Sequence, residues 1–171
     1  MPAPVIQFAK GDYVAFIWER EAKDPMGNAY KYNFFDLVRV QNGKVQEHWD
    51  SVFKNAMPPA GQPVPGIVTQ GIGPKPVAPK NTADEQKAEN IANTEFKDIL
   101  QYGHVELAPK VMAEGYIQHN PNVPGGRAGF MDFFSKVAKP EPIKAEWKNK
   151  PEVIVTSGNL VFYMMDRYSA E

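Results

Sequence analysis

Hydrophobic residues that favour β-strands are concentrated in runs within the first fifty positions of the chain. Tyr13–Trp18 and Tyr32–Val40 are rich in aromatic and β-branched side chains, and Lys44–Asp50 follows as a third run. The turn-like Asp24–Asn28 separates the first two runs, and Asn42-Gly43, a strong short-range hairpin signal, separates the last two. The pattern predicts an antiparallel meander from Val5 to about Phe53.

A stretch rich in proline and glycine follows the meander. Seven of the chain's 16 prolines lie between residues 57 and 80, together with four glycines. Proline removes backbone donors, and glycine raises the entropy cost of an ordered structure. We therefore predict a semi-extended linker over residues 58–80.

Helical spacing begins after this linker. Thr82 and Glu85 stand three positions apart, as in a capping box, and apolar residues then recur at helical intervals as far as Tyr102, before the helix-stopping Gly103. Four further elements are predicted: a short helix over 105–112, a glycine-rich turn at 124–126, an amphipathic helix over 128–138 and strand-like sequence over 151–170.

The last strands repeat the pattern of the first ones. The segment Val153–Tyr163 parallels Ile6–Phe16 with Gly158 against Gly11, a shift of 147 residues. One copy starts the chain and the other ends it. We expect this arrangement when a tandem two-domain protein is read from the middle of one repeat to the middle of the next.

Composition argues against several classes of function. The formal net charge is -1, from 19 basic and 20 acidic residues, so we expect neither nucleic acid nor a membrane as a partner. No apolar stretch reaches the roughly 20 residues that span a bilayer. There is no cysteine, and the three histidines lack metal-ligand spacing, so we predict no metal site and no cofactor. No secretion signal is visible, which leaves the cytoplasm and a mature exported form both open.

Two segments carry a family resemblance. The first is Asp36–Asp50, and the second is Tyr116–Pro121, followed by Gly126 and Phe130–Phe134. They resemble the closing hairpin and the middle of the SnoaL-like polyketide cyclases, a branch of the nuclear-transport-factor-2-like superfamily. The likeness is closest to the bacterial SnoaL-like group predicted to catalyse aldol condensations. The resemblance implies an α+β fold, in which a cone-shaped, curved antiparallel sheet packs against helices.

The two family segments stand in reversed order. Residues 1–57 correspond to the C-terminal half of a SnoaL-like domain, and residues 81–171 correspond to its N-terminal half. Two explanations stay open: a circular permutant with one duplicated strand, or two half-domains completed by other polypeptide. Because each half alone would expose a sheet edge and an apolar face, we expect the halves to assemble within one chain or by exchange between chains.

The turn at Asn42-Gly43 decides which side chains share a face of the hairpin. A two-residue type I′ turn would set Asp36 opposite Trp49, whereas a three-residue loop with a bulge would set Asp36 opposite His48. The sequence does not choose between them. The family resemblance favours the bulged register, because it implies that Asp36 and Asp50 share the inner face.

Four residues are the catalytic candidates. Asp50, at the end of an inward-facing strand in an apolar cone, is expected to have a raised pKa and to act as a general acid or base. Asp36 occupies a position that is often histidine in the cyclases. By resemblance, His119 and Asn120 line the mouth of the pocket, where Asn120 would donate a hydrogen bond to an enolate oxygen. Asn120 before proline is also ordinary turn chemistry.

Substrate contacts are expected from a wider group: Phe34, His48, Trp49, Tyr116, Met131 and Phe134. His48 has a structural reading as well, and Met131 and Phe134 also suit a core position. Trp18 and Met165 occupy equivalent positions in the internal repeat, and one of the two copies should face a cavity.

The leading hypothesis is a small cofactor-free enzyme that performs acid/base chemistry of the aldol, cyclase or isomerase type on an apolar carbonyl compound. The alternative is a non-catalytic module of the same fold that binds a hydrophobic ligand or mediates assembly. The expected partners are an apolar small molecule and a second copy of the chain, with domain swapping as one route to a homodimer.

Overall fold

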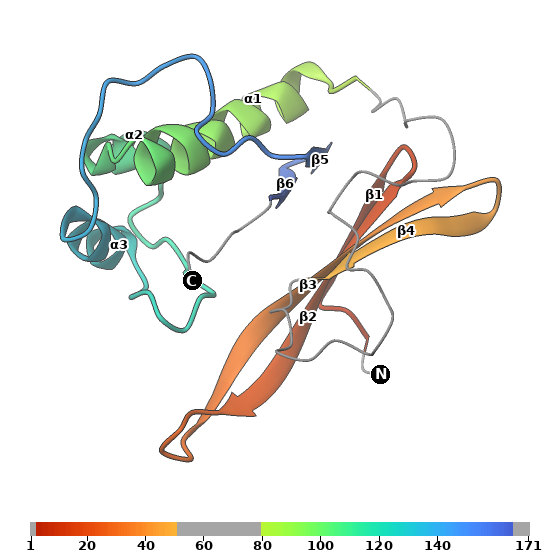
Figure 1. Ribbon diagram of the computed structural model, residues 1–171, viewed down its shortest axis with the longest axis horizontal. Coiled ribbons are helices and arrows are strands. Elements are labelled where there is room, and N and C mark those ends of the chain that lie inside the picture. Colours follow the sequence, from red (N-terminus) through yellow and green to blue (C-terminus); the bar gives the residue numbers. More distant parts are fainter. Residues whose placement is uncertain (1–2, 51–79, 166–171) are drawn as a thin grey trace, which may run out of the picture. The chain divides into compact units, whose positions relative to one another are not determined.

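The computed structural model describes residues 3–50 and 80–165, which form a mixed α+β protein (Figure 1). The chain divides into two compact units, one built around the N-terminal strands and one around the helices and the last two strands. Each unit is described by itself below. The linker predicted over residues 58–80 lies outside the described residues, apart from Lys80.

The N-terminal strands form a four-stranded antiparallel sheet, as the strand-forming runs and turn signals predicted. Its strands lie in the order β1-β2-β3-β4: β1 (Ile6–Lys10), β2 (Tyr13–Lys23), β3 (Ala29–Gln41) and β4 (Lys44–Asp50). The predicted turn at Asp24 closes β2 onto β3, because the Asp24 carboxylate accepts hydrogen bonds from the backbone amides of Met26 (2.9 Å) and Asn28 (2.8 Å). The boundary between the two units crosses β2 after Glu19 and β3 before Phe34.

The β3–β4 hairpin corrects the register that the family resemblance favoured. Asn42 and Gly43 both have positive φ (54° and 70°), as a two-residue type I′ turn requires, and Gln41 pairs with Lys44. The register then shifts between Arg39 and Val40. The three-residue loop is therefore absent.

A bulge at Gln46 explains that shift of register. Val45 pairs with Val40 and Glu47 pairs with Arg39, so Gln46 is the extra residue of β4. Beyond the bulge Asp36 stands directly opposite Asp50. The two aspartates thus share a face, as expected, although by a different route.

One face of the sheet holds buried residues of the N-terminal unit. Ala15 and Leu37 are fully buried, and Tyr13 lies 6.4 Å from Trp49 between ring centroids. Arg39 is 1 % exposed, and its guanidinium is paired with the Glu47 carboxylate. The pairing compensates the cost of removing the Arg39 charge from water.

A long helical segment opens the second unit. Helix α1 (Ala83–Asn93) begins at the predicted capping box, since the Thr82 amide donates to the Glu85 carboxylate (2.8 Å) and the Glu85 amide donates to the Thr82 hydroxyl (3.3 Å). The segment continues as a π-helix, η1 (Thr94–Gln101), and the Tyr102 amide donates to the carbonyl of Lys97, five residues back. Gly103 ends it with φ of 81°, as predicted.

Shorter helices cover one side of this segment. They are the 3₁₀-helix η2 (Val105–Leu107), α2 (Ala108–Val111) and α3 (Arg127–Ser135). Buried side chains of η1, of these helices and of the residue after α2 form one apolar core of the second unit: Ile99, Val105, Ala108, Met112 and Phe130. The predicted short helix is therefore present as two short pieces, and the predicted amphipathic helix begins one residue earlier and ends three residues earlier than expected.

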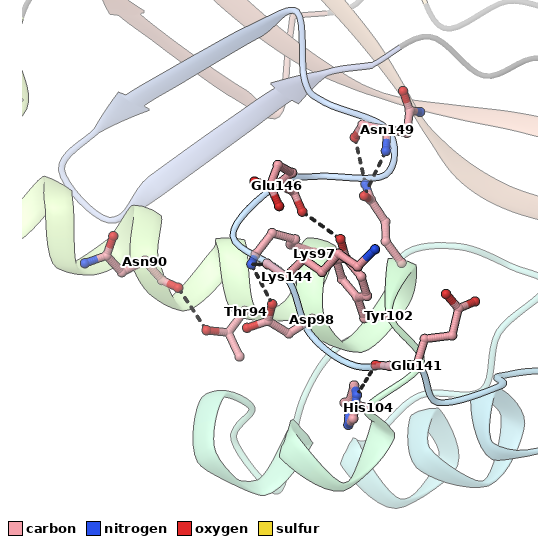
Figure 2. Close-up of polar contacts among 11 residues, drawn as sticks. Asn90, Thr94, Lys97, Asp98, Tyr102, His104, Glu141, Lys144, Glu146 and Asn149 are labelled. Atoms are coloured by element: carbon pink, nitrogen blue, oxygen red, sulfur yellow. Dashed lines mark hydrogen bonds and ion pairs between the residues drawn. The ribbon is translucent and has the colours of Figure 1, made fainter.

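Side chains of η1 and of the residues just after it make polar contacts with the backbone of an extended segment, residues 139–149 (Figure 2). Lys97 Nζ donates to the Lys144 carbonyl (2.7 Å), and the Tyr102 hydroxyl donates to the Glu146 carbonyl (2.9 Å). His104 Nε2 lies 2.7 Å from the Glu141 carbonyl. These contacts satisfy carbonyls of a segment that has no regular secondary structure.

The last two described strands form a hairpin on helix α1. β5 (Val153–Ser157) pairs with β6 (Leu160–Met164), and within the described residues this sheet has two strands. Thr156 Oγ1 donates to Glu89 (2.9 Å), and the Tyr163 hydroxyl donates to Asn93 (2.7 Å). Burial raises the pKa of Tyr163, and the charges of Glu89 and Glu95 raise it further.

This hairpin has the same register as β1–β2. Ser157 pairs with Leu160 as Lys10 pairs with Tyr13, both at the shift of 147 residues seen in the sequence. Gly158 and Gly11 have φ of 60° and 58°. The correspondence of the two segments therefore extends from sequence to backbone pairing.

No helix in the described ranges is both long enough and apolar enough to cross a membrane.

Replacing Gly103 with alanine should destabilise the helical unit. A Cβ atom there would lie 2.7 Å from the Lys139 carbonyl oxygen, and the positive φ would strain any L-residue. We expect the free energy of unfolding to fall by more than about 1 kcal/mol, measured by chemical denaturation. Gly115→Ala is the matched control, because its Cβ would meet nothing within 4 Å; an equal loss in both variants would contradict the prediction.

The hydrogen bonds of His104 predict that the stability of the protein depends on pH. Nδ1 lies 2.7 Å from the Glu106 carboxylate and Nε2 faces the Glu141 carbonyl, so both bonds form only when the ring carries two protons. The hydrogen bond to Glu106 raises the pKa of His104, followed by the bond to Glu141. The contribution of these bonds to folding stability is therefore complete below about pH 6.5, the ordinary pKa of histidine. It is lost as the pH rises through the raised pKa of His104.

Glu106→Gln should lower the pKa of His104 toward the ordinary value, because the anionic acceptor is removed. A histidine ring-proton titration by NMR measures this, with the other two histidines as internal references. An unchanged His104 titration curve would show that the carboxylate does not hold the proton.

Candidate acid–base site

Three polar side chains of the β3–β4 hairpin converge on one face of the sheet. His48 Nε2 lies 2.9 Å from Asp50 Oδ1 and 3.5 Å from Asp36 Oδ1. Asp36 is the least accessible, with 15 % of its side chain exposed, compared with 38 % for Asp50 and 53 % for His48. An imidazole between two carboxylates can hold a proton and pass it on.

The strand geometry explains why these three residues meet. His48 and Asp50 stand two positions apart on β4, so both point to the same face. The bulge at Gln46 then sets Asp50 directly opposite Asp36 on β3. The Asp36–His48–Asp50 cluster is thus a product of the turn and the bulge together.

Trp18 on β2 fixes the orientation of Asp36. Its indole Nε1–H donates to Asp36 Oδ2, which leaves Oδ1 directed toward His48. Phe16 stacks on Trp18 with ring centroids 5.9 Å apart, and Phe34 precedes Asp36 by two positions on β3. The polar cluster therefore has aromatic neighbours on its own face.

Asp50 does not have the burial that the sequence predicted for it. The sequence predicted an apolar enclosure for this carboxylate, whereas 38 % of the Asp50 side chain is exposed. Asp50 is the last residue of β4.

Trp49 lies on the opposite face from the cluster. It falls between His48 and Asp50 on β4, and neighbouring strand residues point to opposite faces. Its ring instead lies beside Tyr13. Of the expected substrate contacts on this hairpin, His48 and Phe34 share the cluster's face and Trp49 does not.

His119 and Asn120 lie in an exposed loop of the second unit. The Asn120 side chain accepts a hydrogen bond from the Asn122 amide (3.0 Å), which is the turn chemistry that the sequence offered as an alternative. This loop and the Asp36–His48–Asp50 cluster belong to different compact units of the chain.

Tyr116 is half-buried against the helical core. Its ring meets Phe130 edge to face at 5.8 Å, and its hydroxyl accepts a hydrogen bond from Gln118 (3.2 Å). Burial raises the pKa of Tyr116, and the Glu95 charge adds to the rise. Burial likewise raises the pKa of Glu95.

Met131 and Phe134 have different surroundings. Met131 lines a shallow hollow of about 400 Å³ together with Val105, Glu106 and Ala138. Phe134 packs on Phe130, with ring centroids 4.5 Å apart. Both side chains pack against the helical core, and Met131 also lines the hollow.

Trp18 is the residue whose role the sequence left undecided. The internal repeat marked it as equivalent to Met165 but gave no face for it, because the pairing of β2 with β3 depends on the turn at Asp24. The available signal was the spacing of Trp18, a hydrogen-bond donor, two positions after Phe16, on a strand that precedes the one with Asp36.

The Trp18–Asp36 contact should be measurable as a coupling energy. We expect a double-mutant cycle of Trp18→Phe and Asp36→Ala to give a coupling of about 1–3 kcal/mol, because the bond joins an indole donor to a carboxylate. Urea denaturation of the four proteins supplies the cycle. Strictly additive losses would show that the bond contributes nothing to stability.

Comparison with known proteins yields no relative for this chain: no family model, no curated protein and no solved structure matches it.

Proposed function

We propose that this chain is a small SnoaL-like enzyme that uses Asp36, His48 and Asp50 for acid/base chemistry on an apolar carbonyl compound. The observation that carries the proposal is the position of His48 Nε2 between the two carboxylates. The proposal includes the cone-shaped fold of that family, with its two halves in permuted order. It rests on the resemblance of Asp36–Asp50 and Tyr116–Pro121 to that family.

The proposed reaction begins with proton abstraction next to a carbonyl group. Asp50, the more exposed carboxylate, takes the proton from the α-carbon, and the C–H electron pair moves into the enolate. An N–H of the His48 ring donates a hydrogen bond to the enolate oxygen. In an aldol closure the enolate carbon then forms a bond to a second carbonyl carbon, whose π electrons move to its oxygen. The new alkoxide takes the proton back from the Asp50 carboxyl group, which returns to the carboxylate form.

Asp36 serves this reaction as the partner that positions His48. Trp18 holds one Asp36 oxygen, so the other remains directed at the imidazole. The cluster thereby supplies a base and an acid in one site without a cofactor.

The aromatic neighbours suit an apolar substrate. Phe16 and Trp18 offer stacked rings, and Phe34 extends the same face. A flat, carbonyl-bearing molecule would bury ring surface against them and leave its carbonyl near His48. The resemblance adds His119, Asn120 and Tyr116 at the mouth of the pocket, a contribution that requires the two halves to assemble.

A second candidate is a binding module without catalysis. The exposure of His48 and Asp50 favours it, since an enzyme of this chemistry excludes water from the reacting atoms. In that function Phe16, Trp18 and Phe34 hold a hydrophobic ligand or a partner, and the cluster only orients it.

Exchange of α-protons in D₂O tests the proposal. A panel of small diketones and aryl ketones is incubated with the protein, and deuterium incorporation next to the carbonyl is followed by NMR. We expect catalysed exchange with at least one compound, and we expect Asp50→Asn to slow it by about 100-fold or more, because a general base contributes that much. Ligand binding is measured separately by calorimetry.

Glu21→Gln is the matched control for this experiment. Glu21 is an exposed carboxylate of β2, and strand alternation sets it on the face opposite Trp18. We expect its exchange rate to equal that of the unmodified protein. Binding without exchange for every compound would favour the binding module, and equal exchange in Asp50→Asn would remove Asp50 from the reaction.

A further inference from the structure

The Asp36–His48–Asp50 cluster has the spacing of a metal-ligand set. Its three ligand atoms, one from each side chain, all lie within 4.8 Å of one another. Ligands held at about 2.1 Å from one ion lie about 3.0 Å apart in an octahedral arrangement and about 3.4 Å apart in a tetrahedral one. The separations of 2.9 Å and 3.5 Å from His48 Nε2 fall in this range, although 2.9 Å is also the length of an ordinary hydrogen bond.

The charges of the cluster favour a cation between the side chains. Asp36 and Asp50 stand directly opposite each other on neighbouring strands, and like charges in that position destabilise a sheet. A protonated His48 supplies one positive charge against two negative ones. A divalent cation, bound with a neutral His48, would balance both carboxylates.

Trp18 donates a hydrogen bond to Asp36, as outer residues commonly do to carboxylates that bind a metal ion. The indole N–H binds Oδ2, so only Oδ1 is directed toward His48 and Asp50. Outer donors of this kind fix the orientation of metal ligands and raise affinity. Asp36 and His48 also lie within paired strands and Asp50 ends one of them, and paired strands hold side chains more rigidly than loops do.

We propose that Asp36, His48 and Asp50 bind a divalent transition-metal ion such as Zn²⁺ or Co²⁺. One imidazole nitrogen with two carboxylate oxygens suits these ions, whereas Ca²⁺ and Mg²⁺ prefer oxygen ligands alone. The exposed side of His48 and Asp50 leaves further coordination positions for water or another ligand.

This inference goes beyond the proposed function, which needs no metal. The ion would take up the same Asp50 oxygen and His48 nitrogen that the acid/base reaction uses. Metal binding is therefore expected to suppress the proposed proton transfer, and removal of the metal by a chelator to restore it.

Metal titration tests the inference without reference to catalysis. The full chain, first stripped with chelator, is titrated with Zn²⁺ by calorimetry and with Co²⁺ by visible absorption, which reports a nitrogen- and oxygen-ligated ion. We expect one ion per chain, with binding lost in His48→Gln. Trp18→Phe should weaken binding roughly tenfold or more, since it removes only the outer donor.

His104→Gln is the matched control, because His104 also has a carboxylate neighbour, Glu106 at 2.7 Å, but no second one. Its affinity should equal that of the unmodified chain. Absence of binding at millimolar ion, or equal binding in His48→Gln and the unmodified chain, would overturn the inference. Either result leaves the proton-exchange experiment, and with it the proposed function, to be judged separately.

Discussion

The pairing of β3 with β4 is the constraint on which the candidate site depends. The Asn42-Gly43 turn starts the hairpin in one register, and the bulge at Gln46 changes it before the strands end. On one face of the shifted part, Arg39 meets Glu47, so a buried guanidinium gains its carboxylate. On the other face, Asp36 meets Asp50 beside His48. A single extra residue thus places a structural ion pair on one face and the candidate cluster on the other.

The two proposals for this cluster have one physical origin. Two carboxylates held opposite each other create a local demand for positive charge, which an imidazolium or a metal ion can meet. Without a metal ion, Asp50 is free to act as the proposed base, whereas the metal-bound form occupies both Asp50 and His48. Trp18 serves both forms equally, since its bond to Asp36 does not involve the oxygen that faces His48.

Local signals predicted most of the secondary structure and part of the site. The Thr82–Glu85 capping box and the Gly103 stop are short-range devices, so the sequence contains all that is needed to recognise them. The bulge at Gln46 is different, because it depends on the partnership of Arg39 with Glu47 across the hairpin. Strand alternation alone is enough to predict that Trp49 points to the face opposite His48 and Asp50. The contact of Trp18 with Asp36 needed the pairing of β2 with β3, which no local pattern specifies.

The two hairpins of identical register raise the question of how the chain tells them apart. Backbone pairing cannot do so, since β1–β2 and β5–β6 obey the same geometry. Side-chain hydroxyls can: Thr156 and Tyr163 satisfy Glu89 and Asn93 of helix α1, whereas the corresponding Ala9 and Phe16 have no hydroxyl to offer. A misplaced first hairpin would leave both polar groups of the helix without these donors. The two hydroxyl groups of Thr156 and Tyr163 therefore distinguish the second hairpin from the first as the partner of helix α1.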